Sequence, residues 1–393
     1  MDAEKAQVTT EEGAPRAKMS DESFDNALTH QTSVTDTEKG SSAYASSIGG
    51  GVHLQEYRKA ERKLVRKLDM VILPLTMCMY LSAYLDRGNM GNARLQGLQT
   101  EVLDNDDIKY DVCLASFYIA YIIFNIPGNM MAKFLPPAAA LSIACLIWGI
   151  AATCQASVTS YAGLVVCRLF IGIGEAGFGP TVPLTTRDYW YKRNEIATRI
   201  SLFIGCGALA GTFGGLIAYG VDIIKGASLS DWRILFLIEG LPTVLLALVV
   251  FFCLPDRPET SKFITEEERT IANTRLNSQG LAEGPRNFHW PSLRHALTDY
   301  KNWMMACMYL GINLTLGSIS GFLPTIIKTM GYSSVNAQLY TVPPYAVALV
   351  YMTIVSNISD RLKIRGLFVF MNGMVAAIGF IILITVQQNQ GVR

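Results

Sequence analysis

The chain has 393 residues, of which 50% are hydrophobic and 17% are charged. Ordinary soluble domains contain about 25% charged residues, so this composition excludes a typical soluble globular protein. The formal net charge of +1 excludes the strongly basic surface of most nucleic-acid-binding proteins. The eight cysteines are scattered without a CxxC pair. We interpret them as small buried apolar residues and expect neither a metal site nor a disulfide.

Residues 1–57 form the first segment, and most of it is rich in Ser, Thr, Asp, Glu and Gly. Such a composition buries too little apolar surface to fold alone, so we predict a disordered cytoplasmic tail. The segment contains no short apolar run with a small-residue cleavage site, and we therefore expect no cleaved signal peptide.

Apolar segments of about 20 residues follow the tail, and about 20 residues is the length with which an α-helix crosses the hydrocarbon core of a bilayer. This pattern predicts an all-α, polytopic membrane protein. We predict nine membrane-spanning helices, at residues 69–91, 112–133, 138–156, 160–184, 197–221, 232–254, 302–324, 335–357 and 367–386.

Lysine and arginine residues gather at alternate ends of these spans. They are dense before the first span, between the fourth and fifth, after the sixth, and between the eighth and ninth. Because cytoplasmic loops carry an excess of lysine and arginine, this distribution predicts a cytoplasmic N-terminus.

Residues 256–300 are the one long hydrophilic segment between spans, and they follow the sixth span. Thr265 and Glu268 have the spacing of a capping box, which predicts a short helix in this cytoplasmic linker. Six spans at 58–255, a linker, and further spans are typical of two-lobed transporters. Residues 301–393 then supply the first three helices of a second half.

Four charged residues lie well inside two of the predicted spans: Asp86 and Arg87 in the first, and Arg168 and Glu175 in the fourth. A charge near the middle of a bilayer costs about 2.5–3.5 kcal/mol, so each should face the bundle interior. Arg168 and Glu175 are about 10 Å apart along their helix, too far to pair with each other. Similar depths in the membrane permit a contact between Asp86 and Arg168.

Two interpretations of these charges stay open. In the first, they form a static network of ion pairs that fixes helix packing. In the second, Arg87 and Arg168 bind an anionic substrate, because arginine is permanently charged and presents a planar fork to a carboxylate. Asp86 and Glu175 then carry protons, because a nearby anion or arginine alters the proton affinity of a buried carboxylate.

Other polar residues of the spans are weaker candidates. Glu239 in the sixth span is a third acidic candidate, for which we favour a structural role. None of the four histidines lies in a predicted span. In the second half, Asn313 and Tyr345 are candidates for substrate contact, although polar side chains also form hydrogen bonds between membrane helices. The same holds, more weakly, for Tyr309, Ser318 and Ser320.

The segment RLFIGIGEAG contains the pattern GxGxxG at Gly172, Gly174 and Gly177. A dinucleotide-binding fingerprint requires a strand before the pattern and a helix that begins at it. This pattern lies inside a predicted membrane helix, so we expect the glycines to allow close helix packing instead. We expect the same of Gly207 and Gly211 in the fifth span, which have GxxxG spacing.

Several motifs resemble the fungal anion:cation symporters of the major facilitator superfamily, which include allantoate, nicotinate and pantothenate permeases. The motifs are LDRGNMGNA, IPGNMMAKFLPP, RLFIGIGEAGFGP, WYKRNEIATR, LIEGLPT, FLPTIIKTMGYSS, TVPPY and SDRLKIRG. The resemblance spans residues 58–393. It implies a twelve-helix fold that moves a small organic anion with protons by alternating access, without a cofactor other than the proton gradient.

The resemblance also implies roles for individual residues. Arg168 and Glu175 match an arginine and a glutamate that anchor the anion and take part in proton coupling, and Asp86 and Arg87 match the pair of the first helix. A cytoplasmic gating motif is matched by Asp360, Arg361 and Arg365. We further expect a monomer in the plasma membrane.

The sequence departs from the family pattern in two places. The loop after the second span, GNMMAKFLPP, lacks the Asp-Arg of the superfamily, and helices ten to twelve do not follow the ninth span. We therefore expect a chain truncated before helix ten. A nutrient sensor with a transporter-like fold and a non-functional truncated product stay open as alternatives. We do not expect an enzyme, because the sequence shows no metal-ligand spacing, nucleophile elbow or intramembrane histidine.

Overall fold

The computed structural model describes residues 51–192, 195–224, 228–261, 263–277, 290–362 and 365–390. All regular elements in these ranges are helical, and nine stretches are long and apolar enough to cross a membrane. The predicted all-α membrane fold is thereby confirmed. Residues 1–50 of the predicted tail lie outside the described ranges, and the chain from Lys59 onward forms one compact unit.

Six predicted spans precede the linker, and each corresponds to one helix or a pair of helices. They are α3 (Gly51–Ala93), α5 (Asp107–Phe134), α6 (Pro137–Cys154), α7 (Tyr161–Ala176) with α8 (Phe178–Tyr189), α9 (Ile196–Ile223) and α10 (Asp231–Cys253). Shorter elements join them: the π-helix η1 (Arg94–Leu98), α4 (Gln99–Glu101) and the 3-10 helix η2 (Gln155–Ser157).

Two of these helices differ from the prediction. α3 begins at Gly51, so residues 51–57 are helical although we assigned them to the tail. The basic residues that follow are good helix formers, which lets the helix begin well before the apolar segment. The fourth predicted span is divided at Gly177, where α7 ends and α8 begins.

The remaining helices are α11 (Glu266–Asn277), α12 (Trp290–Thr298), α13 (Tyr300–Thr329), α14 (Ser334–Leu339), α15 (Val342–Leu362) and α16 (Arg365–Gln390). The capping box at the start of α11 is confirmed. The Thr265 amide donates to Glu268 Oε2 over 3.1 Å, and the Glu268 amide donates to Thr265 Oγ1 over 3.3 Å. α12 was not predicted from the sequence.

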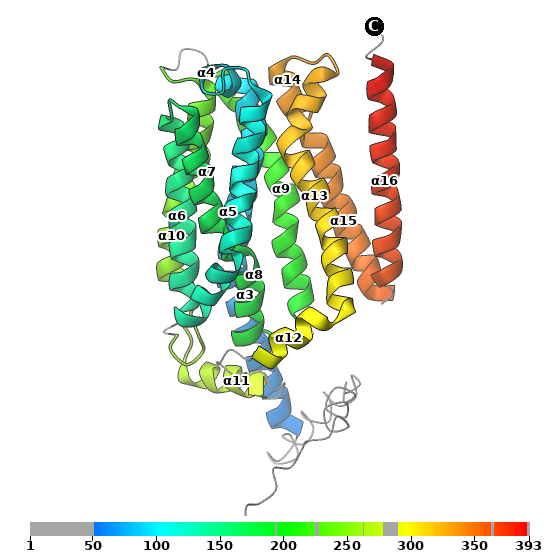
Figure 1. Ribbon diagram of the computed structural model, residues 1–393. Coiled ribbons are helices and arrows are strands. Elements are labelled where there is room, and N and C mark those ends of the chain that lie inside the picture. Colours follow the sequence, from blue (N-terminus) through cyan, green and yellow to red (C-terminus); the bar gives the residue numbers. More distant parts are fainter. Residues whose placement is uncertain are drawn as a thin grey trace, which may run out of the picture. The chain divides into compact units, whose positions relative to one another are not determined.

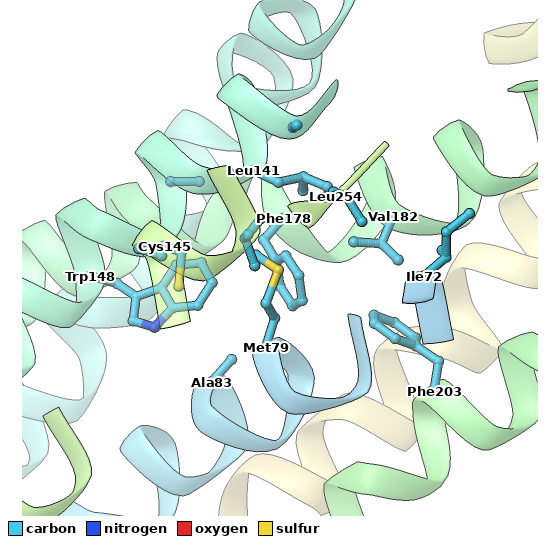
Figure 2. Close-up of a cluster of buried hydrophobic side chains, with 14 of the residues drawn as sticks. Ile72, Met79, Ala83, Leu141, Cys145, Trp148, Phe178, Val182, Phe203 and Leu254 are labelled. Atoms are coloured by element: carbon cyan, nitrogen blue, oxygen red, sulfur yellow. The ribbon is translucent and has the colours of Figure 1, made fainter. Parts of the chain in front are cut away.

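Figure 1 shows α11 near one end of the membrane helices and α4 and α14 near the other. We call these ends the α11 end and the α4 end. A buried apolar cluster near the α11 end joins α3, α6, α8 and α9, with the rings of Trp148 and Phe178 5.3 Å apart (Figure 2). A second cluster, near the α4 end, includes Met90, Trp232 and Phe236. These clusters fix the positions of α3 and α7, which carry the predicted charges.

Ion pairs attach α11 to α3 and to the connection between α8 and α9. Lys67 Nζ lies 2.7 Å from Glu268 Oε2. Arg275 is 3% exposed, and its guanidinium lies 2.8 Å from Glu61 Oε1 and 2.6 Å from Glu195 Oε2. We call these five residues the linker clamp. They hold the linker helix against the first six spans.

The first six spans meet α13 toward the α4 end. The Tyr110 hydroxyl donates to the Gly321 carbonyl over 2.9 Å. A Cβ atom at Gly91 would lie 2.9 Å from the same carbonyl, and one at Gly317 would lie 3.0 Å from the Tyr118 hydroxyl. Residues 300–314 of α13 are instead exposed. α13 therefore contacts α3 and α5 through its C-terminal half, from about Gly317 onward. Its N-terminal half, toward the α11 end, is exposed.

Candidate functional site

The four predicted charges lie on α3 and α7, and we call Asp86, Arg87, Arg168 and Glu175 the charge cluster. Asp86 is 2% exposed, Arg168 2% and Glu175 1%. The Arg87 side chain is 20% exposed. Burial of four charged groups in an apolar bundle requires partners for each of them. The structure supplies these partners only in part.

Arg87 and Glu175 form an ion pair between α3 and α7. Arg87 Nε donates to Glu175 Oε2 over 2.7 Å, and Arg87 Nη2 lies 2.6 Å from the same oxygen. The second carboxylate oxygen, Oε1, has no hydrogen-bond partner among the described residues. Oε1 of Glu175 is therefore a buried hydrogen-bond acceptor that no described residue donates to.

Arg168 reaches α3 at Asp86, but its acceptor is the main chain. Nη1 of Arg168 donates to the Asp86 carbonyl over 3.3 Å. Nε and Nη2 of Arg168 and Oδ2 of Asp86 are buried without a partner in the described part of the chain. The predicted contact between Asp86 and Arg168 is therefore present. It is a hydrogen bond to the Asp86 main-chain carbonyl and not an ion pair with the Asp86 carboxylate.

The ion pair between Arg87 and Glu175 was not predicted from the depths of the residues along their helices. Depth along a helix locates a Cα atom, whereas the long side chain of Arg87 extends its guanidinium away from that level. As predicted, Arg168 and Glu175 do not pair with each other; each instead contacts one of two adjacent residues of α3.

Aromatic rings surround the Arg87 guanidinium, and they were not predicted from the sequence. Its Cζ atom lies 4.9 Å from the ring centre of Tyr84, 5.3 Å from that of Phe117 and 5.2 Å from that of Tyr121. Rings at such distances attract a cation. Tyr84 precedes Arg87 by three residues, and Phe117 and Tyr121 are four apart on α5. Helical spacing therefore places Tyr84 and Arg87 on one face of α3, and Phe117 and Tyr121 on one face of α5. It does not show that these two faces contact each other.

The glycines of RLFIGIGEAG pack closely against other helices. A Cβ atom at Gly174 would lie 2.7 Å from the Trp148 main-chain nitrogen, and one at Gly177 would lie 3.0 Å from the Gly128 Cα atom. The segment is helical before and after Gly177, so the strand that a dinucleotide fingerprint requires is not found there. The packing interpretation of this motif is confirmed.

The candidates of the second half do not join the charge cluster through a recorded contact. Asn313 is exposed, and its amide donates to the Tyr309 carbonyl of its own helix over 2.8 Å. The Tyr345 ring packs on α9, where a Cβ atom at Gly211 would lie 2.5 Å from it. Ser318 and Ser320 also donate to carbonyls of their own helix, at Leu314 and Gly317. Tyr309 is 69% exposed, and its carbonyl accepts the hydrogen bond from Asn313.

The predicted gating residues lie where α15 ends and α16 begins. Asp360 and Arg361 belong to the last turn of α15, and Arg365 is the first residue of α16. Their side chains lie outside the described part of the structure, so the gating motif stays a prediction.

Known proteins match most of this chain. A family model described as Major Facilitator Superfamily matches residues 76–392. The "MFS transporter prlL" of a fungal species (strain NRRL 50135) is 38% identical over 331 residues, which are 82% of this chain and 66% of that protein. The "Uncharacterized transporter C1683.12" of Schizosaccharomyces pombe is 37% identical, over 83% of this chain and 68% of that protein. The chain thus spans about two thirds of the length of these relatives.

Solved structures show the same fold at lower identity. The crystal structure of a D-xylose-proton symporter has a TM-score of 0.55 and 17% identity, and covers 74% of this chain and 69% of that one. A bacterial homologue of the human lysosomal transporter Spinster has a TM-score of 0.55 and 21% identity, over 75% of this chain and 63% of that one. The relatives are named as transporters, which confirms the expectation that this chain is not an enzyme. It belongs to the Major Facilitator Superfamily.

Proposed function

We propose that this chain moves a small organic anion across a membrane together with protons, by alternating access. A carboxylate such as nicotinate, allantoate or pantothenate is the substrate class, as the resemblance to fungal anion:cation symporters implies. The observation that carries the proposal is the buried Arg168 guanidinium, two of whose nitrogens have no partner in the described residues.

Arg168 and Arg87 are the proposed anion ligands. Free donors on a buried guanidinium favour an anion that can accept two hydrogen bonds. Arg87 is the more exposed of the two, and its charge is already shared with Glu175. An arriving carboxylate would compete with Glu175 for this guanidinium. In this proposal Asn313 and Tyr345 contribute contacts from the second half.

Asp86 and Glu175 are the proposed proton carriers. A carboxylate that loses its arginine partner in a buried site becomes easier to protonate, because the uncompensated charge is costly there. Displacement of Glu175 from Arg87 by the anion would therefore favour proton uptake by Glu175. Binding of the anion and of the proton then support each other, which is the requirement for symport.

Alternating access is supported by the uneven contact between the two sets of helices. Tyr110 and Gly321 hold α5 and α13 together toward the α4 end, whereas residues 300–314 of α13 are exposed toward the α11 end. We assign the α11 end to the cytoplasm because the basic segments gather there. Asp360, Arg361 and Arg365 would form the gate at that end. A monomer in the plasma membrane, with its N-terminus in the cytoplasm and no cofactor, completes the proposal.

The proposal is tested by uptake into proteoliposomes that contain this chain. Labelled nicotinate, allantoate and pantothenate are offered with and without an imposed proton gradient. We expect uptake of at least one of them to rise with the gradient. A Glu175→Gln protein should still exchange internal for external substrate but should no longer concentrate it.

Glu267→Gln is the matched control, because Glu267 lies exposed on α11 outside the charge cluster. It should leave uptake unchanged. Uptake that ignores the proton gradient, or accumulation by the Glu175→Gln protein, contradicts the coupling. An Arg168→Lys protein with unaltered uptake contradicts the role of Arg168 as an anion ligand.

A further inference from the structure

Glu239 is a buried carboxyl group outside the charge cluster. It belongs to α10, is 6% exposed, and lies in the part of this helix that packs against the apolar cluster near the α4 end. No ion pair of Glu239 is recorded within the described residues. An ionised carboxylate at this position would therefore be a buried charge without a cation beside it, which is a strongly unfavourable state.

The partner of Glu239 is the side chain of Asn89 on α3, which is fully buried. Asn89 Nδ2 donates a hydrogen bond to Glu239 Oε2. Two buried atoms of this pair have no partner among the described residues, namely Glu239 Oε1 and Asn89 Oδ1. Both are acceptors when Glu239 is ionised, so neither can satisfy the other.

One proton on Glu239 Oε1 removes both deficiencies. The resulting O–H group is a donor, and Asn89 Oδ1 is the unused acceptor of the amide that already contacts the other carboxyl oxygen. A carboxylic acid and a primary amide then form two parallel hydrogen bonds, each group donating once and accepting once. We propose that Glu239 holds a proton at neutral pH in such an acid–amide pair with Asn89.

The charged and titratable groups around this pair are few. On α3, the acidic residue Asp86 precedes Asn89 by three residues. On α7, the Arg168 guanidinium lies 5.9 Å from the ring centre of Phe236, which precedes Glu239 by three residues. On α6, Cys145 Sγ lies 3.5 Å from the Thr243 carbonyl of α10.

The pair places a third proton site beside Asp86 and Glu175. Asn89 lies on the same face of α3 as Asp86, because residues three apart are neighbours on a helix. Loss of the Glu239 proton would add a negative charge next to Asp86 and would leave Asn89 Oδ1 unpaired again. A role for this proton loss in the transport cycle rests on the proposed function. The presence of the proton on Glu239 does not rest on it.

Infrared spectroscopy of the purified chain tests the proposal directly. A protonated carboxyl group has a C=O stretching band separate from those of carboxylates. We expect such a band at pH 7 in the wild-type chain, a shift of the band when glutamate is labelled with 13C, and its loss in the Glu239→Gln protein. Glutamine keeps the size of the side chain and can donate to Asn89 Oδ1, so this variant should fold. Glu267→Gln is the exposed control and should keep the band.

Absence of a glutamate-derived acid band from the wild-type chain at pH 7, or an unchanged band in the Glu239→Gln protein, overturns the proposal. If that variant does not fold, a 13C-labelled Glu175→Gln protein decides. Persistence of the shifted band assigns it to Glu239, and its loss contradicts the assignment. Since no substrate is present, failure here would leave the proposed anion transport standing, and absence of uptake would leave the infrared result standing.

Discussion

Arg87 of α3 and Glu175 of α7 share one carboxylate oxygen between two guanidinium nitrogens, and the Glu175 side chain is fully buried. Removal of either partner leaves the other charge without compensation. We expect Arg87→Ala and Glu175→Ala each to lower the free energy of unfolding by about 3–5 kcal/mol, which is the usual cost of breaking a buried ion pair. The double variant should lose clearly less than the sum. Thermal unfolding in detergent measures all three.

The surface pair Arg269–Glu266 on α11 is the matched control for this cycle. Its nitrogen and oxygen lie 2.5 Å apart, but the Glu266 side chain is 83% exposed. Exposed helical pairs contribute about 0.3–0.5 kcal/mol, so its coupling should be small. Equal coupling energies for the two pairs would show that burial of Glu175 does not strengthen its ion pair.

Gly174 permits the close approach of α7 and α6. Its Cβ atom would lie 2.7 Å from the Trp148 main-chain nitrogen and 2.9 Å from the Ala144 carbonyl. Main-chain atoms inside packed helices cannot move aside, so Gly174→Ala should lower stability by about 1–3 kcal/mol. Gly220→Ala is the control, because no atom lies within 4 Å of the added Cβ. A thermal shift assay should show a lower unfolding temperature for the first variant only.

Arg275 is the central residue of the linker clamp. Its guanidinium pairs with Glu61 and Glu195, and its side chain is 2% exposed. Arg275→Met should therefore loosen α11 and increase its cleavage by a protease of broad specificity. Mass spectrometry of the fragments measures the rate. The Glu267→Gln protein, whose substitution is exposed on the same helix, should be cleaved at the wild-type rate. Equal rates for all three proteins would argue against the clamp.

Glu268 should make the attachment of α11 sensitive to acid. Burial raises the pKa of Glu268, but hydrogen bonds from Lys67 and the Thr265 amide, together with the charges of Lys67 and Lys63, hold this pKa below its ordinary value. The stabilisation is therefore complete above the unfolded-state pKa, about 4.3, and is lost as the pH falls through the lower folded-state value. Because the pair is partly exposed, the effect should stay below about 1 kcal/mol.

The comparison of the wild type with Glu268→Gln isolates this effect. The difference between their unfolding temperatures should be constant from pH 7 to pH 5 and should shrink between about pH 4 and pH 3. Other carboxylates titrate in the same range, so only the difference is informative. A difference that does not change with pH would mean that the ion pair with Lys67 contributes nothing to stability.

The helices followed from the sequence because length and apolar composition alone define a membrane span. The capping box at Thr265 also fixed the start of α11 correctly. Two features were missed. The basic residues before the first span belong to α3, although the pattern of apolar residues predicted no helix there. α12 has neither an apolar span nor a cap in its sequence. Hydrogen bonds from α13 hold it, because the Asn302 side chain donates to the Ala296 carbonyl and the Trp303 indole donates to the Leu297 carbonyl.

The residues of the charge cluster were identifiable because charges inside spans are rare. Their pairing was not, since it depends on side-chain reach and helix rotation, neither of which a span boundary reveals. Asn89 shows the same limit. Because Asn89 follows Asp86 by three residues, the sequence indicates that both lie on the same face of α3. Its contact with Glu239 depends on the packing of α3 against α10, which the sequence does not show.

The contacts of α13 with α3 and α5 toward the α4 end are electrically neutral. Tyr110 donates one hydrogen bond to a main-chain carbonyl, Gly91 and Gly321 touch without side chains between them, and no ion pair there joins α3 or α5 to α13 in the described residues. One neutral hydrogen bond contributes only about 0.5–1.5 kcal/mol net, because water replaces the lost partner. Separation of α13 from α3 and α5 at this end would therefore leave no charged group without its partner.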